Sequence, residues 1–143
     1  MLNSIIIQKK GLLTALLPNE CAIIVEDPLI ESRHPLRTNW ASDRVLFVSY
    51  HDINPNGMHP GELLGLVPFD ASMAEEIRSF VKKHAEAPEL WTLIVACPHG
   101  RARGNSIAAS LLREYPGIPL RGSVVPEAVN SFVVDMFCEA RPV

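Results

Sequence analysis

The sequence lacks several features that mark specialised classes of protein. Its 143 residues hold three cysteines with no Cys-x-x-Cys pair and no Cys/His cluster at zinc-ligand spacing. We therefore expect neither a disulfide framework nor a metal site. The net charge is −3, so the chain has no excess of basic residues to attract nucleic-acid phosphates or acidic lipids. No apolar run has the length of a membrane span, and the first lysines follow a short apolar run, the reverse of a secretory signal.

These absences favour a cytoplasmic protein without general nucleic-acid or membrane binding, in a compartment where a reactive thiol stays reduced. Apolar residues make up 48% of the chain and charged residues 20%, which is the balance of a folded globular domain. The length suits one domain over residues 1–143.

Short apolar runs alternate with amphipathic segments along the chain. The expected strands are residues 4–7, 22–25, 45–50 and 92–96. The expected helices begin at Met73, where Ser72 and Glu75 form a capping box, near Gly104, and at Glu127. This alternation predicts an α/β fold with a mostly parallel central sheet and helices on both faces. Because strand 45–50 is almost wholly apolar, we expect it in the middle of the sheet.

The segment 92–113 contains the most reactive combination of residues. An apolar strand leads to Cys97, a glycine-bearing turn leads to Arg103, and an Ala/Leu-rich helix follows. Such a turn directs backbone N–H groups and the positive end of the helix dipole at one spot, which is a site for an anion. A cysteine there is expected to favour its thiolate form. The spacing therefore suggests phosphate chemistry on a cysteine nucleophile.

The segment Cys97-Pro-His-Gly-Arg-Ala-Arg103 matches the Cys-x-x-Gly-x-x-Arg loop of the cysteine-dependent protein tyrosine phosphatase superfamily. From Cys21 to the helix after the loop, the chain resembles the small dual-specificity members. The resemblance implies that Cys97 takes the phosphoryl group from a phosphorylated protein or small phosphoester, and that water hydrolyses the phosphocysteine without a metal or other cofactor. It implies a bidentate Arg103 and a phosphate-binding loop formed by Pro98, His99, Gly100, Arg101, Ala102 and Arg103.

The resemblance also implies an aspartate general acid on an upstream loop. Asp52 is the first candidate because it follows strand 45–50 closely. Asp70 is the alternative, although its position suits the start of the next helix. Because the carboxyl ends of parallel strands border one crevice, we expect Asp52 and Cys97 to meet there from neighbouring strands.

Two residues depart from the family pattern. Ala96 stands where the family usually has His, and Gly104 stands where it usually has Ser or Thr. The family hydroxyl helps the cysteine thiolate leave, and whether Asn105 or Ser106 replaces it stays open. Two alternatives therefore accompany the phosphatase prediction. One is a phosphatase-like module that binds phosphorylated ligands with little or no turnover, and the other is a rhodanese-like sulfurtransferase. The sequence predicts neither the substrate nor the oligomeric state.

Overall fold

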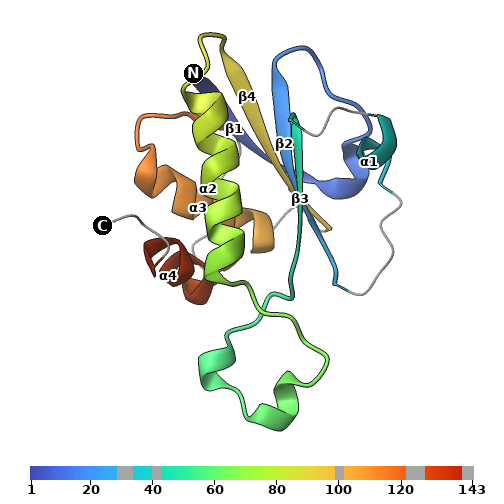
Figure 1. The fold of residues 1–143 in the computed structure, drawn as a ribbon, viewed down its shortest axis with the longest axis vertical. Coiled ribbons are helices and arrows are strands. Elements are labelled where there is room, and N and C mark those ends of the chain that lie inside the picture. Colours follow the sequence, from blue (N-terminus) through green and yellow to red (C-terminus); the bar gives the residue numbers. More distant parts are fainter. Residues whose placement is uncertain (29–33, 40–42, 99–101, 122–127, 140–143) are drawn as a thin grey trace.

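Five parallel strands form one sheet, in the order β3-β2-β4-β1-β5. The structure is a computed structural model, and it describes residues 1–28, 34–39, 43–98, 102–121 and 128–139 (Figure 1). The strands are β1 (Leu2–Lys9), β2 (Glu20–Glu26), β3 (Val45–Ser49), β4 (Trp91–Cys97) and β5 (Leu120–Arg121). The α-helices are α1 (Leu36–Asn39), α2 (Ala71–Ala85), α3 (Ala102–Glu114) and α4 (Ser131–Glu139). The predicted α/β class with a mostly parallel sheet is confirmed.

The connections between strands run in two directions across the sheet. From β1 the chain moves to β2 and then, through α1, to β3 at one edge; it returns through α2 to β4 and passes through α3 to β5. Figure 1 shows α2, α3 and α4 together on one face and α1 on the other. This division is what right-handed crossovers require when their direction reverses. Helices thus lie on both faces, but among the described residues the second face carries just the one-turn α1 and a short 3-10 turn, η1 (Lys10–Leu12).

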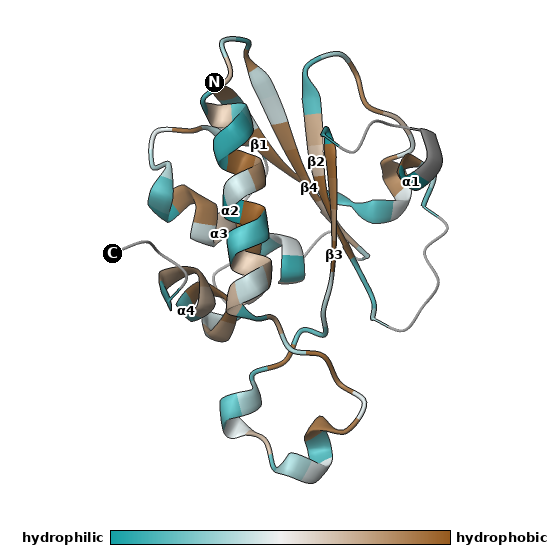
Figure 2. Cartoon of the chain, viewed as in Figure 1, coloured by the Kyte–Doolittle hydropathy of each residue, from teal (hydrophilic) through white to brown (hydrophobic). Residues whose placement is uncertain are grey.

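The sheet has a hydrophobic core on each face, because successive side chains of a strand point to opposite faces. The larger core lies between the sheet and helices α2, α3 and α4, and the smaller one lies under residues 13–16 and α1. Figure 2 shows the middle of the central strands as hydrophobic. Cys97 belongs to the larger core and Ala96 to the smaller, so the two side chains lie on opposite faces of β4.

The prediction of a central strand at 45–50 is wrong, because β3 lies at the edge of the sheet. Its residues are apolar because both of its faces are covered, not because it has two neighbours. Val48 is buried in the larger core, and on the other face the Arg37 guanidinium lies 4.0 Å from the centre of the Phe47 ring. The one-turn α1 lies between β2 and β3, where no helix was predicted, and the two-residue β5 was not predicted either.

Two helices begin at other residues than predicted. Asp70, not Ser72, caps α2: its Oδ1 accepts the N–H of Met73 at 2.8 Å, and the helix begins at Ala71. Both residues are good caps, but the cap at 70 lets the preceding Phe69 enter the larger core. Helix α4 begins at Ser131, not at Glu127, which lies outside the described residues.

Candidate functional site

The site lies where the chain reverses its direction across the sheet. Strands β2 and β4 are neighbours, but the chain leaves β2 toward β3 and leaves β4 toward β5. In open α/β sheets, ligands bind at the carboxyl ends of the strands at such a switch point. Cys97 is the last residue of β4, and Asp27 directly follows β2. These two residues therefore flank the crevice.

Cys97 faces the first turn of α3. Its side chain is 2% exposed. A Cβ atom placed on Gly104 would lie 3.4 Å from the Cys97 Sγ and 3.2 Å from Cγ2 of Ile7 on β1. The first turn of α3 thus packs closely against the thiol and β1, with little room for a side chain at 104. Of the predicted phosphate-binding loop, Pro98 is half-buried and Ala102 opens α3, while His99, Gly100 and Arg101 lie outside the described residues.

Arg103 is anchored through one of its terminal nitrogens. Nη1 donates to Oδ1 of Asp27 at 2.8 Å and to the carbonyl oxygen of Tyr50 at 3.0 Å. The Arg103 side chain is 11% exposed and that of Asp27 42%, so the ion pair lies at the rim of the crevice. Among the described residues, no group accepts from Nε or Nη2 of Arg103. That edge of the guanidinium has the geometry to bind two oxygens of one anion.

Tyr50 links the remaining site residues. It is fully buried, and its hydroxyl donates to the carbonyl oxygen of Arg103 at 3.4 Å. Burial raises the pKa of this hydroxyl well above its ordinary value; the Asp52 charge raises it further, Arg103 opposes the rise, and Cys97 adds to it. A charge shifts a pKa only from nearby, and the charges of Asp52, Arg103 and Cys97 all act on this hydroxyl.

Asp52 lies on the loop that follows β3. The expectation that its strand and that of Cys97 are neighbours is wrong, because β2 lies between β3 and β4. Asp52 is exposed, and its Oδ1 accepts a hydrogen bond from Nδ2 of Asn130 at 3.0 Å. The alternative acid, Asp70, uses its carboxylate to cap α2.

The two departures from the family pattern have different structural settings. Ala96 is fully buried in the smaller core, on the face away from the thiol. On α3, the Ser106 hydroxyl donates to the carbonyl oxygen of Ala102 at 3.0 Å and accepts the N–H of Asn130 at 2.8 Å. The hydroxyl proton of Ser106 is thus donated to a carbonyl oxygen of the same helix. Asn105 is buried, and its Oδ1 has no hydrogen-bond partner among the described residues.

Three residues of the site were missed in the sequence: Asp27, Tyr50 and Asn130. Asp27 carried a usable signal, because an acidic residue directly after a buried strand lies at the ligand-binding edge of a parallel sheet. Asn130 carried a weaker one, as a capping residue ahead of the apolar segment 132–137. Nothing in the sequence indicates that the carbonyl of Tyr50 accepts from Arg103.

The chain was also compared with known proteins. No protein-family model, no curated protein and no solved structure matches it. Functional assignment therefore depends on the geometry of the site. Within the described part of the chain, no three His, Cys, Asp or Glu residues are grouped as metal ligands. No described helix is long and apolar enough to cross a membrane.

Proposed function

We propose that this protein hydrolyses phosphoesters through a phosphocysteine intermediate, as the cysteine-dependent tyrosine and dual-specificity phosphatases that its sequence resembles do. One observation carries the proposal. Cys97 faces the first turn of the helix whose Arg103 is anchored through Nη1 alone, with Nε and Nη2 unbound by described residues. A nucleophilic sulfur and a guanidinium edge at one helix N-terminus suit a tetrahedral dianion.

In the first step, Arg103 binds two phosphoryl oxygens and the Cys97 thiolate attacks phosphorus. The S–P bond forms as the bond from phosphorus to the ester oxygen breaks. Protonated Asp52 gives its proton to that oxygen, so that a neutral alcohol or phenol leaves. Asp27 stays on Nη1 throughout and keeps the other edge of the guanidinium directed at the anion.

In the second step, a water molecule attacks the phosphocysteine and gives a proton to the Asp52 carboxylate. The S–P bond breaks, inorganic phosphate forms, and Cys97 leaves as a thiolate. Gly104 offers no hydroxyl to that leaving sulfur, and the Ser106 proton is held by the carbonyl of Ala102. The second step is therefore the slow one, and the phosphoenzyme accumulates.

The same observation favours a second candidate, a module that binds phosphorylated ligands and turns them over slowly or not at all. Its binding groups are the same, because the anion contacts come from Arg103 and the loop before it. The two candidates differ in the rate of the second step. Under either, the ligand is a phosphorylated protein or a small phosphoester.

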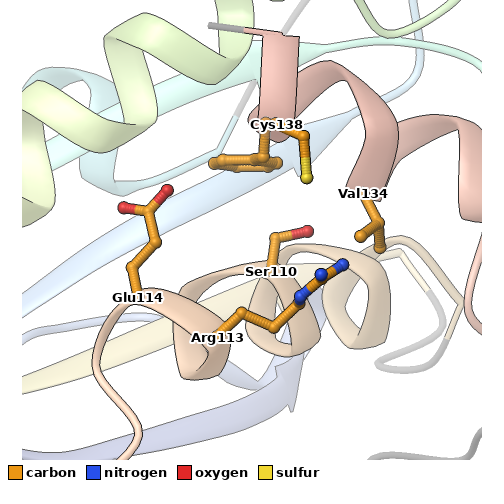
Figure 3. A pocket seen from close by; sticks show the side chains of 6 residues that line it. Ser110, Arg113, Glu114, Val134 and Cys138 are labelled. Carbon is orange, nitrogen blue, oxygen red and sulfur yellow. The ribbon is translucent and has the colours of Figure 1, made fainter. Parts of the chain in front are cut away.

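The test is hydrolysis of p-nitrophenyl phosphate and of a phosphotyrosine peptide between pH 5 and 8. We expect activity in the parent protein and none in Cys97→Ser. Cys138→Ser is the matched control. Cys138 is an exposed thiol on α4, and it lines a small pocket with Arg113 and Glu114 of the last turn of α3 (Figure 3). Cys97 instead faces the first turn of that helix. Activity that survives Cys97→Ser would contradict the mechanism.

A parent protein that hydrolyses neither substrate but binds inorganic phosphate would support the binding module, provided that Arg103→Ala abolishes this binding. Production of thiocyanate from thiosulfate and cyanide would instead identify a sulfurtransferase, because a phosphatase produces none.

A further inference from the structure

Asn130 connects three parts of the site that are far apart in the sequence. Its Nδ2 donates to Oδ1 of Asp52 at 3.0 Å and to the carbonyl oxygen of Ile53 at 2.9 Å. Its backbone N–H donates to the Ser106 hydroxyl at 2.8 Å. The loop after β3 and the first turns of α3 are thus held together through one residue at the start of α4.

The orientation of the Asn130 amide follows from its partners. Its Oδ1 accepts the N–H of Phe132 at 3.0 Å, which caps α4. Its Nδ2 faces a carboxylate oxygen and a carbonyl oxygen, which only accept hydrogen bonds. A flipped amide would lose all three interactions, so the NH₂ group is fixed toward Asp52.

The surroundings of Asp52 give this contact its importance. The Asp52 side chain is exposed, and no other described side chain donates a hydrogen bond to it. An exposed aspartate has several rotamers, and only some of them direct its carboxyl group at the anion site. Asn130 restricts them. The Ser106 hydroxyl in turn ties Asn130 to Ala102, the residue before Arg103.

We infer that Asn130 is a positioning residue that holds the Asp52 carboxyl group in place for proton transfer to the leaving oxygen. This inference rests on the proposed phosphatase function. It assigns the role to the Nδ2 donor, as distinct from the capping of α4 by Oδ1. A general acid matters most when the leaving group is a poor one. Loss of the donor should therefore slow the cleavage of unreactive esters and spare reactive ones.

The variant that separates the two roles is Asn130→Ser. Serine is a good N-cap and keeps the backbone N–H that binds Ser106, but it removes the Nδ2 donor. We expect kcat/KM to fall about tenfold for phenyl phosphate, a poor leaving group, and by less than about threefold for p-nitrophenyl phosphate. In the Asp52→Asn background, Asn130→Ser should leave the ratio of the two kcat/KM values unchanged. Asn130→Ala, which also removes the cap, reports the cost of the cap itself as lost stability.

Equal losses on both substrates, or no loss on either, would overturn the positioning role and leave the phosphatase proposal standing. A parent protein that hydrolyses neither substrate would instead refute the phosphatase. The contact between Asn130 and Asp52 is then tested by NMR. The chemical shifts of the Asn130 side-chain amide protons should change as the Asp52 carboxyl group titrates. They should not change in this way in Asp52→Asn. Amide protons that are insensitive to that titration would overturn the inference whatever the activity.

Discussion

Gly104 offers the sharpest test of how the thiol and the first turn of α3 work together. A Cβ at this position would lie 3.4 Å from the Cys97 Sγ. A serine hydroxyl is one bond further out, and the rotamer that points toward the sulfur brings it within hydrogen-bonding range. Gly104→Ser should supply the proton donor that the second step lacks, and Gly104→Ala should supply the Cβ without it.

The packing cost of both substitutions is small and nearly the same. The new Cβ lies 3.2 Å from Cγ2 of Ile7, so this half-buried side chain must move by a few tenths of an ångström, at about 1 kcal/mol. Replacing glycine in a helix returns about 0.5–1 kcal/mol. Both variants should therefore unfold within about 1 kcal/mol of the parent protein.

The effect on turnover is larger. A hydrogen bond to a charged group contributes about 1.5–3 kcal/mol, and each 1.36 kcal/mol of barrier is about a tenfold change in rate. If half of that energy is realised in the transition state, Gly104→Ser raises the steady-state rate about four- to twelvefold. In stopped-flow assays with p-nitrophenyl phosphate, the initial burst of p-nitrophenol should shrink in the serine variant and persist in the alanine variant. A serine variant no faster than the alanine variant would refute the reasoning about the second step.

Two further predictions concern the surroundings of the site. Asp27→Asn removes the carboxylate that orients the guanidinium of Arg103. We expect kcat/KM to fall about tenfold and the free energy of unfolding to fall by roughly 1 kcal/mol. Asp135→Asn makes the same charge change on the exposed surface of α4 and should alter neither quantity. An unchanged or higher kcat/KM would mean that the Asp27 carboxylate weakens anion binding instead of orienting Arg103. Burial raises the pKa of the Cys21 thiol from 9.0 to about 12. Between these two pH values the folded state keeps a proton that the unfolded chain releases. The free energy of unfolding therefore falls by about 1.4 kcal/mol for each pH unit of increase. Urea unfolding of Cys21→Ala at pH 8.5 and 10.5 should show a shallower decline than the parent protein, and equal declines would contradict this.

The local elements near the site could be predicted because their signals are local. The apolar runs at 22–25 and 92–96 lie within β2 and β4, and the Cys-x-x-Gly-x-x-Arg pattern indicated both Cys97 and Arg103. A buried parallel strand needs continuous apolar sequence, and a helix needs a start and a stop. These requirements are readable from a few adjacent residues.

Strand order and the partners within the site could not be predicted. An edge strand covered on both faces has the same apolar sequence as a central one, so β3 could not be told from β2. The contacts of Arg103 with Asp27 and of Asn130 with Asp52 join residues 76 and 78 positions apart. Competing caps are also equivalent in sequence, as Asp70 and Ser72 show, until packing of the neighbouring residue decides between them.

The most direct test of the central claim is the identity of the covalent intermediate. The parent protein is mixed with p-nitrophenyl phosphate, denatured rapidly during the burst, and mapped by peptide mass spectrometry. We predict one phosphoryl group on the peptide that carries Cys97, and none on that peptide in Cys97→Ser. Release of p-nitrophenol by the parent protein with no phosphoryl group on Cys97, or with the group on another residue, would contradict the proposed mechanism.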